Sequence, residues 1–247
     1  MITAGIDLGA QPERTAVASI KWTAGRAVIE NVVSRAEDQT ILQMVKQTGK
    51  AGIDCPFGWP DAFVEFVTSH RAGHLRVPAD GHGPRRNLTM RRTDVFVYEQ
   101  LRLTPLSVSA DRIAHVALRC AVLLAKFEAA GGPVDRSGSG PIAEVYPAAS
   151  LRSWGLDHRG YKQKTATVAL AGLVDHLLDE APWLDCTTHE QAMRRSHDVF
   201  DAVVAAMTAR AAALGQTIPP AADDLAAATA TAEGWIAIPD EPISALL

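Results

Sequence analysis

The hydrophobic pattern of the first 55 residues predicts a series of strands interrupted by one helix. Short apolar runs bounded by turn residues predict the strands, and apolar residues at helical spacing between the third and fourth runs predict the helix. The strands are expected at residues 2–9, 14–20, 27–34 and 51–55, and the helix at residues 38–47. Three strands, a helix and a further strand are typical of a mixed open sheet, not of an all-β protein or a helical bundle.

The remainder of the chain predicts further helices and one more central strand. A short helix is expected within residues 60–73, followed by an irregular loop at 74–87. Longer helices are expected at 109–130, 163–178 and 188–214, a fifth strand at 142–146, and an edge strand or a segment packed on the core at 234–238. Thr188 and Gln191 have the spacing of a capping box at the start of the last helix. We therefore expect an α/β fold with a mixed five-stranded sheet and helices on both faces.

The chain length fits a single domain with one insertion. At 247 residues the chain can bury one sizeable core, and neither an internal repeat nor a clear linker divides it. We expect one domain over residues 1–247, with an arginine-rich insertion or lid at about 60–108.

Composition and charge narrow the class of protein. The hydrophobic fraction is 47%, and no run approaches the roughly 18 apolar residues of a membrane span. Met1 is followed directly by the first strand, which leaves no room for a signal peptide. Three cysteines, an odd number without CxxC spacing, argue against a disulfide framework or a zinc ribbon. We therefore expect a cytoplasmic protein with no membrane partner.

Positive charge is concentrated in one segment of a chain that is acidic as a whole. The net charge is −4, which argues against a protein that coats nucleic acid, but six arginines fall between His70 and Asp94. They are Arg71, Arg76, Arg85, Arg86, Arg91 and Arg92. Because this segment follows the fourth strand, we expect a mobile lid over the end of the sheet, where ligands of open α/β sheets bind. Arg92 would face the pocket and Arg85 and Arg86 its rim; the alternative is a solvated basic loop.

Five acids stand at strand ends or on one face of a helix. Asp7 and Asp54 each interrupt an apolar strand just before a turn, and Glu144 lies in the fifth strand. Asp198 and Asp201 are three residues apart, so they share one helical face beside an apolar stripe. A carboxylate buried in a central strand costs several kcal/mol unless it is paired, protonated or bound to a cation.

Carboxylates that are brought together repel one another, so this set predicts bound divalent cations. Oxygen ligands with open positions suit Mg²⁺ or Mn²⁺ better than zinc, and two ions about 4 Å apart would support an in-line phosphoryl displacement. Single residues also have simpler explanations. Asp54 could be a turn acid, Asp198 a partner of the helix dipole, and Glu144 the partner of an arginine.

The order of these acids, on strand one, strand four and the late helix, resembles the RNase H-like superfamily and its Holliday-junction resolvase branch. More closely, the chain resembles the family known as domain of unknown function 429, described as predicted RNase H-like nucleases. The matching segments are GIDLG at 5–9, GIDCPFGWP at 52–60, RRTD at 91–94, EVYPAA at 144–149, YK at 161–162, SHDVFDAVVAAMTA at 196–209 and EGWI at 233–236.

The resemblance implies a nuclease-like metal site. Its Mg²⁺ or Mn²⁺ ligands would be Asp7, Asp54, Asp198 and Asp201, with Glu144 close by as a further catalytic acid. Arg92, Asp94 and Lys162 would lie near the substrate pocket by the same carry-over. The implied activity is divalent-metal-dependent phosphodiester hydrolysis, with nucleic acid or a phosphorylated small molecule as the partner.

Two other classes of function remain open from the sequence. GIDLG also resembles the first phosphate loop of actin-like and sugar-kinase-like phosphotransferases, but the chain is too short for their two domains and has no second glycine-rich loop of the required type. A non-catalytic RNase H-like binding protein would suit the modest basic charge. The full set of acids argues against that alternative, because buried carboxylates without a function cost stability.

Overall fold

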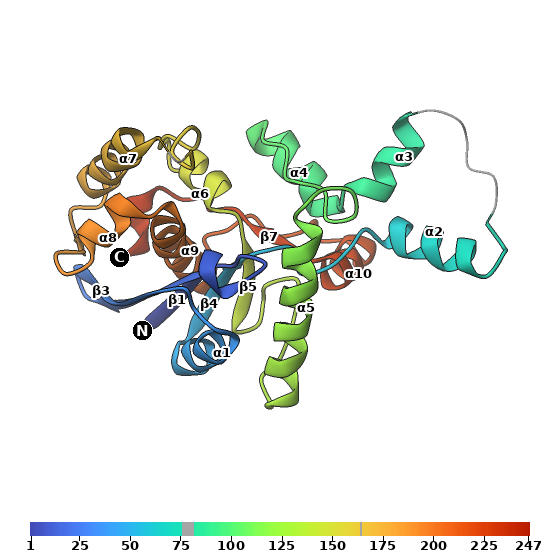
Figure 1. Ribbon diagram of the computed structural model, residues 1–247, viewed down its shortest axis with the longest axis horizontal. Helices are drawn as coiled ribbons and strands as arrows, with labels where there is room; N and C mark the ends of the chain where they lie inside the picture. Colours follow the sequence, from blue (N-terminus) through green and yellow to red (C-terminus); the bar gives the residue numbers. More distant parts are fainter. Residues whose placement is uncertain (76–81, 164) are drawn as a thin grey trace.

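A seven-stranded mixed sheet forms the centre of the computed structural model, which describes residues 1–75, 82–163 and 165–247 (Figure 1). The strand order is β6-β3-β2-β1-β4-β5-β7. The strands are β1 Ile2–Asp7, β2 Ala16–Thr23, β3 Arg26–Ser34, β4 Lys50–Asp54, β5 Ile142–Val145, β6 Leu184–Asp185 and β7 Ile236–Ala237. β1, β2 and β3 are antiparallel neighbours, whereas the other pairs are parallel. The mixed α/β fold is confirmed, but five strands was the wrong number, because two-residue strands extend both edges.

Helices cover both faces of the sheet, as expected. The helices are α1 Asp38–Gln47, α2 Asp61–Arg71, α3 His82–Thr89, α4 Arg92–Leu101, α5 Ala114–Ala129, α6 Pro147–Ser153, α7 Thr167–Glu180, α8 Glu190–Arg195, α9 His197–Ala213 and α10 Asp224–Glu233, with short 3₁₀ turns at Pro12–Arg14 and Ile243–Leu246. α9 packs directly on one face, with α6, α7 and α8 around it, while α1 and α5 cover the other face (Figure 1). Each face therefore has its own buried core.

The expected helix at 188–214 is two helices, and the break has a local cause. Ser196 has an extended backbone (φ −135°, ψ 116°), and its hydroxyl accepts a hydrogen bond from the Val199 amide. Ser196 is therefore the N-cap of α9, and it satisfies one of the amides that the first turn of a helix leaves unpaired. The capping box expected at Thr188 is not formed, since α8 begins only at Glu190.

The helix expected at 109–130 begins five residues late. The hydroxyls of Ser107 and Ser109 donate to the carbonyls of Thr89 and Leu88, and Asp111 accepts the Ser107 amide. These side chains offer the backbone an alternative to helix, which is the usual behaviour of Ser and Asp near helix starts. The helix expected at 163–178 likewise begins only at Thr167.

The arginine-rich segment contains more regular structure than the sequence indicated. His82–Thr89 is a helix where we expected a loop, and Arg76, with the rest of 76–81, lies outside the described residues. α2 and α3 lie toward one end of the molecule (Figure 1). The starts of α2 and α4 are both tied to α10, because the Glu233 carboxylate accepts the backbone amides of Asp61 and Arg92, at 2.8 and 2.6 Å. These two helix starts are therefore packed on the domain, where we expected an insertion or mobile lid.

The three cysteines are buried and unpaired. In the described ranges, no helix combines the length and apolar character that a membrane crossing requires.

The close contact between α9 and β1 depends on small side chains on the α9 face of the strand. Thr3, Gly5 and Asp7 alternate onto the α9 face of β1, and the Thr3 hydroxyl donates to the Ala206 carbonyl at 2.8 Å. A Cβ atom on Gly5 would lie only 2.0 Å from the Ala202 carbonyl oxygen. The helix backbone therefore rests directly on the strand backbone.

We expect Gly5→Ala to lower the free energy of unfolding by about 1–3 kcal/mol, because α9 must move away from β1 to admit the methyl group. Gly172→Ala in α7 is the matched control, since no atom lies within 4 Å of its added Cβ. That change should stabilise the protein by about 0.5–1 kcal/mol, as alanine favours the helix. Urea unfolding of both variants measures the difference. Equal effects of the two changes would contradict the packing described for Gly5.

Candidate metal centre

Strand alternation and register place the first two acids side by side. Asp7 ends β1 and Asp54 ends β4, and the two residues are direct partners in the parallel pairing of these strands. Asp7 shares a strand face with Gly5, and Asp54 shares one with Gly52, whose added Cβ would lie 2.6 Å from the Ala205 carbonyl oxygen. Both carboxylates therefore emerge on the face that α9 covers, where the two strands end.

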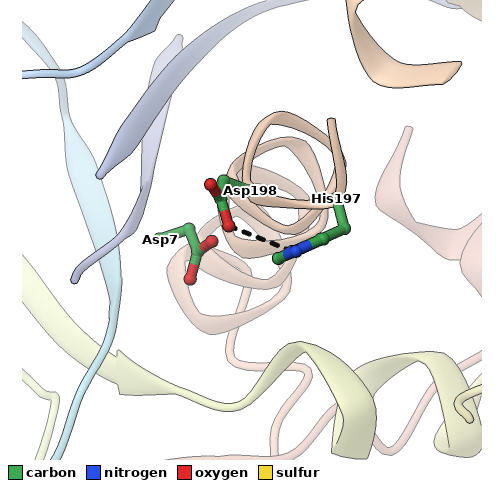
Figure 2. Close-up of side chains that lie close together, drawn as sticks. All are labelled: Asp7, His197 and Asp198. Atoms are coloured by element: carbon green, nitrogen blue, oxygen red, sulfur yellow. Dashed lines mark ion pairs between the residues drawn. The ribbon is translucent and has the colours of Figure 1, made fainter. Parts of the chain in front are cut away.

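The first turns of α9 bring the remaining acids to the same point. One carboxylate oxygen from each of Asp7, Asp54 and Asp201 lies within 4.8 Å of the others. A second group, within the same limit, consists of Asp7, His197 and Asp198. Figure 2 shows Asp7 facing this start of α9, with His197 beside Asp198. Asp7 belongs to both groups, so the structure brings together all four residues that we expected as metal ligands. We call these four acids, Asp7, Asp54, Asp198 and Asp201, together with the adjoining His197, the carboxylate cluster.

Burial and mutual repulsion disfavour the charged forms of the strand acids. Burial, reinforced by the charges of Asp201 and Asp54, raises the pKa of Asp7 well above its usual range. Burial raises the pKa of Asp54 to about 7; Lys162 opposes the shift, and Asp201 adds to it. Without a cation, the two carboxyls hold protons at a pH where exposed aspartates have lost them.

Asp201 is the most enclosed member of the cluster. Its side chain is completely buried, and its Oδ1 accepts a hydrogen bond of 2.8 Å from the Tyr161 hydroxyl. The ammonium group of Lys162 lies 2.6 Å from Oδ2. That contact is an ion pair without hydrogen-bond alignment, and within the described chain Oδ2 accepts no hydrogen bond. The charge of Lys162 therefore offsets part of the cost of burying the Asp201 carboxylate, although Oδ2 has no aligned donor.

Asp198 is more exposed, and its neighbours favour its charged form. Although burial alone would raise its pKa, His197 and Arg14 together lower it. Nδ1 of His197 lies 3.0 Å from Oδ1 of Asp198, and Nε of Arg14 lies 3.8 Å from Oδ2. Asp198 also stands in the first turn of α9, where the helix dipole favours a negative charge.

A divalent cation fits this cluster. The carboxylate oxygens of Asp7, Asp54 and Asp201 converge, and the pKa values of Asp7 and Asp54 are raised. A cation there would remove the repulsion that the single charge of Lys162 leaves. Oxygen ligands suit Mg²⁺ or Mn²⁺, whereas the imidazole of His197 in the second group also suits transition ions.

Glu144 does not join the carboxylate cluster, contrary to our expectation. Its neighbours Ala143 and Val145 pack against Ala205 of α9, so Glu144 points to the opposite face of the sheet. There it pairs with Arg91, with Nη2 2.7 Å from Oε1, and it accepts the Phe57 amide at 2.9 Å. The simpler explanation, an acid that pairs with an arginine, therefore describes its position.

Arg91 is the centre of a buried ion network and has no donor left for a ligand. Its five guanidinium N–H groups donate to Asp94, Glu144 and the Glu233 carbonyl, over distances of 2.7 to 3.1 Å. Asp94 is fully buried and also accepts the Arg91 amide at the start of α4. Asp94 therefore holds Arg91 in place and cannot touch a substrate.

The other residues expected to bind substrate occupy different places. Lys162 borders a cavity beside the cluster and pairs with Asp201. Arg92 is exposed and is not among the cavity residues, so the expectation that it faces the pocket is wrong. Arg85 and Arg86 are exposed on α3, and Arg86 lies over the Tyr98 ring. Neither of them borders the cavity in the described part of the chain.

Three residues at or near the site were missed by sequence reasoning. His197 precedes Asp198 directly, and a histidine next to an expected ligand is a signal that could have been used. Tyr161 precedes Lys162, but nothing local ties either residue to Asp201. Arg91 was counted only as one of several arginines and as part of the RRTD segment. A buried acid on the far face of β5 requires such a partner, but the face that Glu144 takes follows only from the packing of Val145 against α9.

The comparison with models of known protein families matches residues 5–225 to a family described as Protein of unknown function (DUF429). Comparisons with curated proteins and with solved structures found no match. The matched range contains every residue of the carboxylate cluster.

Proposed function

We propose that this chain, which belongs to the DUF429 family, is a divalent-metal-dependent phosphodiester hydrolase with an RNase H-like, nuclease-type site. The observation that carries the proposal is the convergence of the Asp7, Asp54 and Asp201 carboxylates at a point where Lys162 supplies a single positive charge. Carboxylates arranged in this way without a ligand would cost stability, so a bound cation explains them best.

Asp7, Asp54, Asp198 and Asp201 would hold Mg²⁺ or Mn²⁺, with His197 as a nitrogen ligand in the second group. Bound ions of this kind activate water and stabilise the charge of a phosphoryl group under attack. The residues around them have separate tasks. Tyr161 fixes the orientation of Asp201, and Lys162 presents a positive charge to the cavity.

The charge of Lys162 is secured by its surroundings. Burial alone would lower the pKa of Lys162, but Asp201 raises it well above its usual range, so the amine stays protonated. About half of the side chain is exposed, and an ammonium group in this position can contact a phosphate oxygen.

The fold supports the same proposal. The five inner strands comprise three antiparallel strands followed by two parallel ones, with helices on both faces, as the RNase H-like resemblance implies.

Titration with Mn²⁺ tests the proposal. We expect the protein to bind Mn²⁺, and we expect Asp7→Asn to abolish binding, because Asp7 belongs to both ligand groups. Asp201→Asn should weaken binding at least about tenfold. Asp179→Asn is the matched control, the same change at an exposed position of α7. Isothermal titration calorimetry measures affinity and stoichiometry, and hydrolysis of a chromogenic phosphodiester measures activity.

Unchanged Mn²⁺ binding in both Asp7→Asn and Asp201→Asn would rule out the assignment. Intact metal binding without hydrolysis of any phosphodiester would favour the non-catalytic alternative. Circular dichroism of each variant separates loss of binding from loss of folding.

A further inference from the structure

A cavity of about 240 Å³ opens directly beside the carboxylate cluster. Asp54 and Lys162 both border it. Asp54 belongs to the cluster, and Lys162 pairs with Asp201 of the cluster. Its remaining walls come from the loop after β4, the start of α4, the segment before α5, the end of β5 and strand β7, and they include Leu106 and Tyr146.

The walls of the cavity are mostly apolar. Proline, leucine, isoleucine and valine side chains form much of the lining, and Tyr146 adds an aromatic ring. The charged pair of Arg91 and Glu144 also borders the cavity, but every N–H of Arg91 is already donated. The positive charge available to a ligand from these walls is therefore that of Lys162.

The size of the cavity limits its occupant. Pockets for drug-sized molecules measure roughly 300–1,000 Å³, so this one suits a single ring system with a short attachment. An apolar, aromatic-lined pocket accepts the face of a nucleobase, since every base can stack on an aromatic side chain. The phosphate on the sugar of that nucleotide would extend toward Lys162 and the cluster.

We propose that this cavity binds one nucleobase of the substrate, adjacent to the phosphate that is cleaved. This inference rests on the proposed phosphodiester hydrolase activity and specifies its substrate as a nucleotide held by a single base. The nucleotide comes either from a mononucleotide ester or from the end of a strand. Both sources offer a single free base next to a phosphate, whereas a base in the interior of a duplex is not free to enter the cavity.

Binding of thymidine monophosphate and of methyl phosphate to the Mn²⁺-loaded protein tests the inference. The two ligands share a phosphate, and only the first carries a base. Because base stacking contributes about 1–3 kcal/mol, we expect the nucleotide to bind about 5- to 150-fold more tightly. Leu106→Trp should fill the cavity and remove this preference, and Tyr146→Leu should reduce it by removing the ring. Leu118→Trp is the matched control on α5, because Leu118 is exposed and does not border the cavity.

The outcomes separate the two proposals. Intact Mn²⁺ binding with equal affinities for both phosphates, or an unchanged preference in Leu106→Trp, overturns the cavity inference alone. A retained preference for the nucleotide without Mn²⁺ binding overturns the metal-dependent function alone. Competition by a linear thymidine oligonucleotide but not by its circular form identifies strand ends as the source. Competition by neither form identifies the mononucleotide, and equal competition by both forms contradicts recognition of a single terminal base.

Discussion

Replacing Arg91 with methionine is expected to lower the free energy of unfolding by about 3–5 kcal/mol. The change leaves Glu144 and Asp94 buried without their shared cation, at side-chain exposures of 2% and 0%. An unpaired buried carboxylate costs far more than the lost hydrogen bonds themselves. At roughly 2–4 °C per kcal/mol for a chain of this size, the melting temperature should fall by about 6–20 °C. Thermal unfolding followed by circular dichroism measures this fall.

Arg194→Met is the matched control for Arg91→Met. Arg194 also contacts two acids, Asp175 and Glu190, but those acids are exposed on the surface. Ion pairs in water contribute about 0–1 kcal/mol, so the control should shift the melting temperature by only a few degrees. Similar losses in the two variants would show that the Arg91 network is not the stabilising element described above.

Asp54→Asn is expected to stabilise the metal-free protein at alkaline pH and to have no such effect at acidic pH. The folded-state pKa of Asp54 is about 7, against an ordinary value of 3.8. A carboxyl with a raised folded-state pKa adds stability below the unfolded value, near pH 4, and this contribution is lost as the pH rises through 7. At about 1.4 kcal/mol per pKa unit, the loss amounts to roughly 4 kcal/mol, and asparagine avoids it because it does not ionise.

Chemical denaturation in EDTA at pH 4 and pH 8 checks this prediction. The difference between Asp54→Asn and the natural protein should grow toward pH 8, whereas Asp240→Asn, the same change at an exposed position, should stay close to the natural protein. A difference that does not depend on pH would contradict the assigned pKa of Asp54. Added Mn²⁺ should reverse the order at pH 8, since it stabilises only a protein that can bind it.

Local patterns were sufficient for most of the sheet. Alternating and apolar runs located all five inner strands, and helical spacing gave Asp38–Gln47 without error. The edge strand β7 lies within the segment expected at 234–238, whereas β6 was not expected, because two residues are too short for any periodicity to appear. The position of Asp7 and Asp54 at strand ends was likewise visible from the sequence, because each acid precedes a turn.

The environment of each acid was harder to predict. Glu144 looked equivalent to Asp54, yet its place in the alternation of β5 sends it to the other side of the sheet. Only the knowledge that Val145 faces α9 distinguishes the two cases, and that contact spans distant parts of the chain. Lys162 and Tyr161 reach Asp201 from an irregular segment, where no period relates sequence position to direction. Contacts of this kind follow from tertiary packing alone.

The contact between β1 and α9 can form only late in the synthesis of the chain. The hydrogen bond from Thr3 to Ala206 joins residues 203 positions apart. At roughly 5–20 residues per second, a ribosome takes roughly 10–40 s to synthesise the chain between them. During that time the Thr3–Gly5 face of β1 has no helix to cover it, and Asp7 and Asp54 have neither Asp198 nor Asp201 beside them. A chain released before α9 is made therefore has neither a closed sheet face nor the carboxylates of Asp198 and Asp201 beside those of Asp7 and Asp54.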